Sequence, residues 1–238
     1  MLKRADWPAP DGVEAGYTTR VGGVSSGPWA ALNLGMRCGD VPAEVEENRR
    51  RLGALLPAPP LWLHQVHGTR LIAAAEWQPG IAADAIWTAQ PATVLAILTA
   101  DCLPLLLAGR RGDWVAALHC GWRGLAAGII EKTLADLPAA GAGASAWLGP
   151  AICAAHYPVG DEVRDRLIAL SAELAPCFSR RGNRWHADLY GIVRHCLCAA
   201  GVTAIFGGAR CTHHEPETFF SYRRDRATGR QAAMIWIN

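Results

Sequence analysis

The stretch LAILTADCLPLLL, residues 95–107, is an apolar run interrupted by Thr99, Asp101, Cys102 and Pro104. Pro104 cannot donate to a strand ladder, so we expect the strand to end or bulge at Asp101 and Cys102. The next run, WVAALHCGWRG at 114–124, also reaches a polar residue before it turns into a helix. Short apolar runs bounded by turn residues are typical of strands buried on both faces. The ends of such strands are common ligand-binding positions in α/β folds.

Working outward from this stretch, apolar runs predict strands at 71–75, 85–88, 94–99, 114–119, 145–148, 203–206 and 232–236. Apolar residues at helical spacing predict helices over 43–56, 124–137, 161–174 and 187–200, with Asp40 as the cap of the first. Because strands and helices alternate through the middle of the chain, we expect a single α/β domain over 1–238. A layered α+β arrangement is the main alternative.

Composition and charge exclude several classes of protein. A length of 238 residues suits one sizeable core, and a net charge of +2 gives no reason to expect a nucleic-acid partner. The longest apolar run is too short and too polar to span a bilayer, and the N-terminus lacks the apolar run of a signal peptide. We therefore expect a cytoplasmic protein without a membrane partner. There the eight cysteines should be thiols or metal ligands, although no CxxC pair indicates a zinc ribbon.

Potential metal ligands lie at the ends of three separate apolar segments. Cys102 follows one predicted strand, His119 ends another, and LWLHQVHG at 61–68 supplies two histidines. His64 and His67 would point to opposite faces of an extended chain, so we expect one of them to face a shared site. Two imidazoles and a thiolate suit zinc, and three protein ligands leave a fourth position open, as in catalytic sites.

The chain resembles the YfiH-like family, which carries a laccase-domain or multicopper polyphenol oxidase label and an assigned purine nucleoside phosphorylase activity. The matching stretches are TTRVGGVSSGPWAALNLG (18–35), HQVHG (64–68), ADAIWT (83–88), LTADCLPLLL (98–107), HCGWRGLAAGII (119–130), LGPAICAAHYPVGDEV (148–163) and CTHHEPETFFSYRRDRATGRQAAMI (211–235). They cover nearly the whole chain in order. The resemblance implies a layered α-β-β-α sandwich and assigns the metal ligands to His67, Cys102 and His119.

The resemblance also implies a reaction between two small molecules, a nucleoside and phosphate. Adenosine, inosine and S-methyl-5′-thioadenosine would give the free base and (methylthio)ribose 1-phosphate, with adenosine deamination as a side activity. The implied cofactor is Zn²⁺, with Cu²⁺ as the alternative. The catalytic candidates are Asp101, Cys102, His119 and Arg123. The substrate-binding candidates are Arg20, Asn33 and Arg223, the arginines as phosphate clamps and Asn33 as a partner of sugar hydroxyls.

Two other functions use the same residues. In a peptidoglycan-editing hydrolase, which removes a misincorporated amino acid from a cell-wall precursor, Cys102 would be a nucleophile activated by His119. Copper-dependent phenol oxidation is the third alternative, but multicopper chemistry would need many more histidines than eight.

The cysteines other than Cys102 carry no assigned role. Cys120 and Cys153 depart from the family pattern, which has small residues such as Ala and Gly at these positions. The cysteines at 177, 196, 198 and 211 are interpreted as core or incidental thiols.

Overall fold

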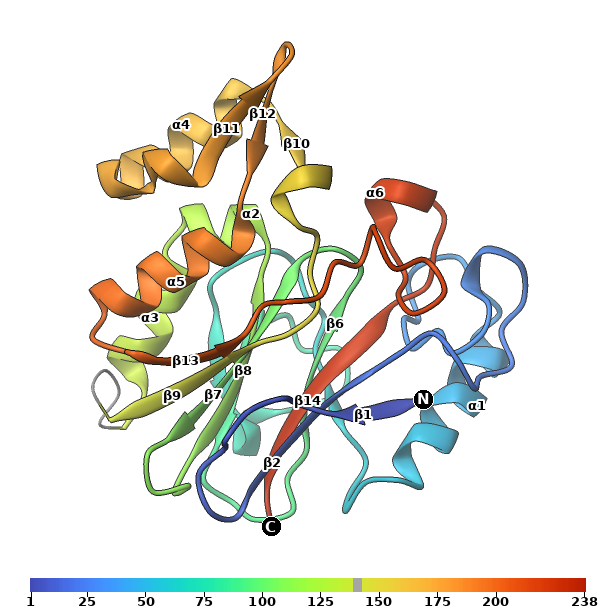
Figure 1. Cartoon of the computed structure of the whole chain (residues 1–238). Coiled ribbons are helices and arrows are strands. Elements are labelled where there is room, and N and C mark those ends of the chain that lie inside the picture. The colour runs from blue at the N-terminus through green and yellow to red at the C-terminus, as the bar shows by residue number, and fades with distance from the viewer. Residues whose placement is uncertain (139–142) are drawn as a thin grey trace.

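The structure is a computed structural model that describes residues 1–138 and 143–238 (Figure 1). The strands are β1 (Leu2–Arg4), β2 (Val13–Thr18), β3 (Leu61–Trp62), β4 (Leu71–Ala73), β5 (Ala85–Thr88), β6 (Leu95–Thr99), β7 (Leu103–Gly109), β8 (Val115–Cys120), β9 (Ala144–Leu148), β10 (Pro158–Val159), β11 (Phe178–Arg181), β12 (Arg184–Ala187), β13 (Ala204–Gly207) and β14 (Gln231–Ile237). The helices are α1 (Pro42–Gly53), α2 (Trp122–Ala126), α3 (Ile129–Asp136), α4 (Asp161–Leu170), α5 (Leu189–Ala199) and α6 (Tyr222–Asp225). Short 3₁₀ helices lie at Gly27–Trp29, Ala74–Glu76, Ala154–His156 and Ala172–Cys177.

In the described part of the chain, the strands form two large sheets and a small one. The five-stranded sheet has the order β1-β2-β14-β6-β3, and the six-stranded sheet has the order β13-β9-β7-β8-β5-β4. The small sheet has the order β10-β12-β11. Most neighbouring strands are antiparallel, and the parallel pairs are β3 with β6, β4 with β5, and β9 with β13.

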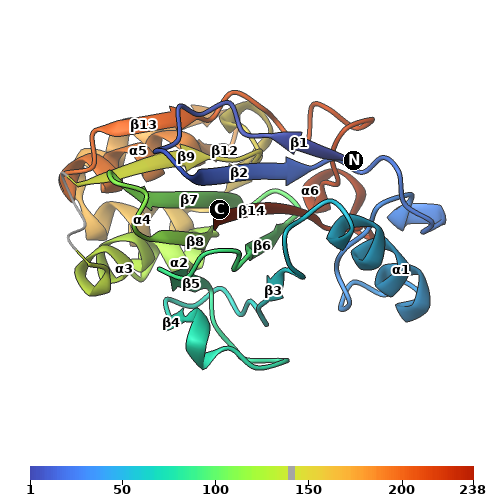
Figure 2. The same ribbon diagram turned by 90° about the horizontal axis from the view of Figure 1, so that it is seen from below.

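The two large sheets pack face to face, with helices on their outer faces (Figures 1 and 2). Alternation along β7 shows the layers, because Leu105 and Leu107 belong to the core under the helices whereas Leu106 and Ala108 belong to the core between the sheets. Helices α3, α4 and α5 cover the six-stranded sheet. Leu52 of α1 packs on the outer face of the five-stranded sheet. The expected α-β-β-α layering is therefore confirmed.

This layering explains why so many strands are apolar throughout. Each central strand contributes alternate residues to a core on either side, so both of its faces are buried although the neighbouring strands are mainly antiparallel. A continuous apolar run usually indicates a parallel sheet covered by helices. Here a second sheet covers one of the two faces instead.

The seven predicted strands are present as β4, β5, β6, β8, β9, β13 and β14. The predicted helix over 124–137 is instead two helices, because Gly128 adopts a φ of 78° between α2 and α3. The helix predicted over 161–174 ends at Leu170. Asp40 is not the cap of α1; Val41 holds that position, and the Asp40 carboxylate accepts the Val41 N–H.

The sequence led us to expect that Pro104 would end strand pairing, but Pro104 lies within β7 and pairs with His119 of β8. The break comes just before it, since β6 ends at Thr99 and β7 resumes at Leu103. Asp101 and Cys102 occupy the turn in which the chain passes from the five-stranded sheet to the six-stranded sheet. The prediction that these two residues lie at a strand end is confirmed.

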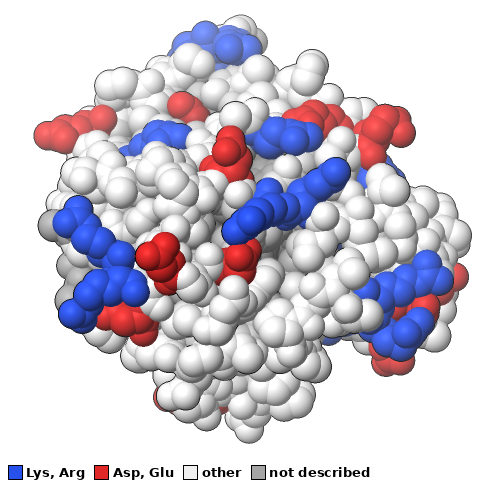
Figure 3. Space-filling model, turned by 60° about the horizontal axis from the view of Figure 1, so that its bottom comes forward, with Lys and Arg blue, Asp and Glu red and all other residues white. Residues whose placement is uncertain are grey.

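Two further findings concern the surface and the thiols. None of the helices in residues 1–138 and 143–238 has the length and apolar character needed to cross a membrane. On the face drawn in Figure 3, basic and acidic side chains are interspersed over a mostly neutral surface. All eight cysteines lie in the described residues and are free thiols, as expected.

Candidate metal centre and pocket

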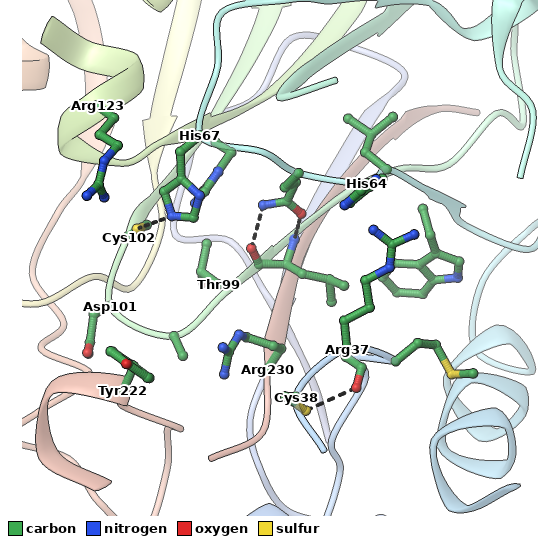
Figure 4. Close-up of a pocket in the computed structure, with 18 of the residues that line it drawn as sticks. Arg37, Cys38, His64, His67, Thr99, Asp101, Cys102, Arg123, Tyr222 and Arg230 are labelled. Carbon is green, nitrogen blue, oxygen red and sulfur yellow. Dashed lines mark hydrogen bonds between the residues drawn. The ribbon is translucent and has the colours of Figure 1, made fainter. Parts of the chain in front are cut away.

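His67, Cys102 and His119 come together at one end of the sheets, where each offers one ligand atom within 4.8 Å of the others. The Cys102 Sγ lies 4.0 Å from His67 Nε2 (Figure 4). The two imidazole rings meet edge to face, with centroids 4.7 Å apart. His64 lies beside the same cavity but away from this cluster, so His67 is the histidine that faces the shared site.

Each ligand is positioned by a different local structure. His119 is the penultimate residue of β8 and is buried, Cys102 is half-buried in the β6–β7 turn, and His67 is exposed in the loop between β3 and β4. His67 and Asp101 adopt positive φ angles of 61° and 97°. Non-glycine residues seldom adopt these angles, and such strain often accompanies functional sites.

The sequence analysis missed Asp84, which immediately precedes β5 and is fully buried. Its carboxylate lies 2.8 Å from His119 Nδ1 and accepts the backbone N–H groups of Val66, His67 and Gly68. Burial by itself would raise the pKa of Asp84, but the His119 contact and these backbone bonds lower it. The signal in the sequence that could have identified Asp84 was an acidic residue directly before a predicted strand.

In the protein without metal, Cys102 and His119 each favour the charged form of the other. Burial opposes both charges, yet the charge and hydrogen bond of His119, with help from His67, lower the pKa of the Cys102 thiol to about 6. In turn, the Cys102 thiolate and Asp84 outweigh burial and raise the pKa of His119 to about 9. The pair provides a reactive thiolate at neutral pH.

The site fits a metal ion. A thiolate and two imidazoles are the ligands that zinc prefers, and the Asp84 carboxylate behind His119 is the outer partner that usually orients a metal-bound histidine. Gly121 keeps the site open, because a Cβ there would lie 3.1 Å from both Cys102 Sγ and His67 Cδ2. A metal ion held by these three residues would have a further coordination position available for a ligand.

The cluster opens into a cavity of about 640 Å³, a size typical of small-molecule sites. The basic residues around it are Arg37, Arg49, Arg123, Arg223 and Arg230. The aromatic residues around it are Trp62, Trp122, Tyr157 and Tyr222. Among the described lining residues, Asp101 is the only carboxylate. This combination suits a ligand with a flat ring and a negative charge.

Three of the predicted non-ligand residues lie at this cavity. Arg123 extends from α2 toward Cys102 and forms no hydrogen bond or ion pair with any described residue, so its donors are available (Figure 4). Asp101 accepts hydrogen bonds from the Thr212 hydroxyl and the Arg223 backbone N–H. The Arg223 guanidinium donates to the Pro158 carbonyl. Arg223 is thus held in place at the cavity wall.

The structure does not bring Arg20 and Asn33 into the cavity lining. The Arg20 guanidinium donates to the carbonyls of Ala30 and Pro216. Asn33 is fully buried, and its side-chain carbonyl accepts the backbone N–H of Arg230. Both residues hold the loops around the cavity, a role that differs from the predicted contact with phosphate or sugar.

Together, the fold and the site define a class: a mixed α/β protein with a three-ligand candidate metal centre that opens into a basic, aromatic cavity. The chain belongs to the family described as multi-copper polyphenol oxidoreductase laccase, which matches residues 14–238. This confirms the family resemblance found in the sequence.

Individual relatives agree with this assignment along nearly the whole chain. A Shigella flexneri protein named purine nucleoside phosphorylase YfiH is 49% identical over 97% of this chain and 96% of its own. A purine nucleoside phosphorylase of Pseudomonas aeruginosa is 48% identical over 98% and 96%. The crystal structure of a Neisseria meningitidis protein superposes with a TM-score of 0.97 at 43% identity, covering 100% of this chain and 99% of the other.

Proposed function

We propose that the protein is a zinc-dependent purine nucleoside phosphorylase acting on adenosine, inosine and S-methyl-5′-thioadenosine. The observation that carries the proposal is the cavity, which joins a metal-ligand cluster to an unpaired arginine and to aromatic side chains. The names of full-length relatives point to the same activity. We also propose that residues 1–238 act as one domain in the cytoplasm, since free thiols suit a reducing compartment.

In the proposed reaction, the bond between ribose C1′ and the purine nitrogen breaks as a phosphate oxygen bonds to C1′. The purine leaves with the proton that hydrogen phosphate gives up, and the other product is ribose 1-phosphate, or its methylthio derivative. Arg123 is free to bind the phosphate with paired N–H groups. Asp101 holds Arg223 at the cavity wall, and the Arg123 guanidinium lies over the Trp122 ring, 4.4 Å from its centroid. Tyr157 and Tyr222 are further aromatic side chains that could contact a purine in the cavity.

A bound zinc ion would act as a Lewis acid and could also activate water for the proposed side reaction, in which adenosine and water give inosine and ammonia. His67, Cys102 and His119 would hold the ion, and Asp84 would keep the His119 ring oriented. Because this centre and the arginines line one cavity, the proposal has a single nucleoside position for both reactions.

The test is product analysis of the zinc-loaded protein with inosine, with and without phosphate. We expect hypoxanthine and ribose 1-phosphate in equal amounts only when phosphate is present. The C102S variant should lose this activity, whereas C198S, at an exposed position outside the cavity, should keep it. Absence of hypoxanthine from the phosphate-containing reaction would overturn the proposal. Adenosine without phosphate tests the deaminase reaction separately.

The lowered pKa of Cys102 favours one second candidate, a peptidoglycan-editing hydrolase with Cys102 as its nucleophile. Iodoacetamide separates the two roles, because a nucleophilic thiolate stays reactive in the purified protein whereas zinc coordination blocks alkylation. Activity lost on alkylation of the zinc-loaded protein, together with release of an amino acid from a cell-wall precursor, would favour the hydrolase.

A further inference from the structure

A second group of thiols and imidazoles lies outside the cavity, around the short 3₁₀ helix Ala154–His156. Cys153 immediately precedes this helix and His156 ends it, while Cys211 lies in the segment that follows β13. A parallel bridge pairs Ala151 with Cys211 and holds the two segments side by side. The ligand atoms of Cys153, His156 and Cys211 all lie within 4.8 Å of one another.

The spacing of these atoms matches a tetrahedral zinc site. The His156 Nδ1 lies 3.3 Å from the Cys153 Sγ and 3.8 Å from the Cys211 Sγ. Zinc binds sulfur at about 2.3 Å and imidazole nitrogen at about 2.0–2.1 Å, so tetrahedral ligands of these two kinds stand roughly 3.6 Å apart. The observed separations lie on either side of this value.

The contacts within this group converge on one atom, the His156 Nδ1. A neutral imidazole nitrogen accepts one proton, yet both sulfurs lie next to the same His156 Nδ1. The Cys211 sulfur additionally accepts the backbone N–H of Cys153, an interaction that suits a thiolate. A cation between the three atoms would satisfy all of them at once.

Neighbouring side chains keep the His156 ring in place. The ring of His213 stacks on it with centroids 4.3 Å apart and an angle of 13° between the planes. His214 stacks on it less closely, with centroids 5.7 Å apart. This packing restricts rotation of the His156 ring, whose Nδ1 already points at the two thiols.

We propose that Cys153, His156 and Cys211 bind a zinc ion separate from the one in the cavity. Two thiolates and an imidazole are a soft donor set that selects zinc over magnesium or calcium. The three residues come from two segments that are far apart in the sequence, so the ion cross-links them. This inference is independent of the proposed reaction.

The position of the cluster gives the ion a structural role next to the cavity. Ile152, the neighbour of Cys153, donates its backbone N–H to the Asp101 carbonyl, and Thr212, the neighbour of Cys211, donates its hydroxyl to the Asp101 carboxylate. An ion that ties Cys153 to Cys211 would therefore fix two of the hydrogen-bond partners of Asp101. Asp101 in turn accepts the backbone N–H of Arg223 at the cavity wall.

The test is zinc content per chain, measured by elemental analysis in the presence of a phosphine reductant, which excludes a disulfide. We expect C153S and C102S each to lose one equivalent and the double variant to lose both. The control C198S removes an exposed thiol outside both clusters and should match the wild type. If only the cavity site failed to bind zinc, the zinc content of C102S would equal that of the wild type, while C153S would still lose one equivalent. The two hypotheses are therefore tested separately.

A second readout uses cobalt in place of zinc. Thiolate-to-cobalt absorption in C102S would arise from Cys153 and Cys211, and it should disappear in C102S/C153S and weaken in C102S/H156Q. H156Q keeps both thiols, and circular dichroism checks that each variant is folded. Equal zinc content in reduced wild type and C153S, or cobalt absorption in C102S that H156Q leaves unchanged, would overturn the proposal.

Discussion

The Asp84 carboxylate lies 2.8 Å from the His119 Nδ1 and also accepts the backbone N–H of His67. One fully buried acid therefore positions both histidines of the candidate metal centre, although they come from different parts of the chain. It orients the ring of one and fixes the backbone of the other. Asp84 is a positioning residue, because its contacts are with the ligands and not with the cavity.

This relationship predicts that D84N weakens metal binding but leaves the other side chains that line the cavity in place. Loss of the negative charge makes the His119 imidazole a weaker metal ligand. The carboxylate accepts backbone N–H bonds with both of its oxygens, whereas an amide can accept them only with its single oxygen. We expect zinc affinity to fall by about 10- to 100-fold, as is usual for outer partners of metal ligands. Competition with a chromophoric chelator measures it, with D113N as the control at an exposed ion pair.

The Cys102–His119 pair predicts an unusual pH dependence of thiol reactivity in the metal-free protein. Because the pKa of Cys102 is lowered to about 6, the thiolate is the main form at pH 7 and is lost below pH 6. Alkylation by iodoacetamide should rise roughly tenfold between pH 5 and pH 8, with its midpoint near the Cys102 pKa. Mass spectrometry of the labelled peptide gives the rate at this residue.

Two results would contradict this expectation. The first is a Cys102 alkylation rate that still rises steeply above pH 8, as it does for an ordinary thiol, which would show that His119 does not stabilise the thiolate. Alternatively, the label could appear first on Cys120 or Cys196. Burial raises the pKa of both of these thiols, so they should stay unmodified in the folded protein.

Gly121 gives a steric prediction. A Cβ at this position would stand 3.1 Å from the Cys102 Sγ and 3.1 Å from the His67 Cδ2, so G121A should push these two ligands apart. We expect at least a tenfold loss of zinc affinity while the melting temperature of the metal-free protein changes little. The matched control is G53A near the end of α1, where a Cβ would meet nothing within 4 Å. Unchanged zinc binding by G121A would show that the ligands do not need this space.

Much of the site could be predicted from local sequence. Asp101, Cys102 and His119 interrupt or end apolar runs, and a buried polar group without a partner is unfavourable, so their placement at strand ends indicated a shared function. The choice between His64 and His67 followed from the family resemblance. The α-β-β-α layering also came from that resemblance, since the alternation of strands and helices alone favoured a single α/β domain, with a layered α+β arrangement as the alternative.

The rest depends on contacts between distant segments, which a sequence pattern does not contain. Asp84 reaches His119 because β5 pairs with β8, and Cys153 meets Cys211 because a bridge joins Ala151 to the segment after β13. Arg20 was expected to bind phosphate, but its guanidinium instead donates to the backbone carbonyls of Ala30 and Pro216. These outcomes are set by non-local packing.

The free guanidinium of Arg123 gives the prediction that most directly tests the proposed phosphate position. Arg123 lines the cavity with its donors available to a ligand, whereas the Arg223 guanidinium already donates to the Pro158 carbonyl. R123Q should raise the KM for phosphate by roughly tenfold or more, as expected when a charge-assisted hydrogen bond worth about 1.5–3 kcal/mol is lost. The KM for inosine should change little, because the purine and ribose contacts remain.

Initial rates over a range of phosphate concentrations at saturating inosine provide the measurement. R111Q is the matched control, since Arg111 pairs with Asp113 on the surface and lies outside the cavity. If R123Q instead raised the KM for inosine and left that for phosphate unchanged, Arg123 would contact the nucleoside. The phosphate would then have to bind at another of the basic side chains around the cavity.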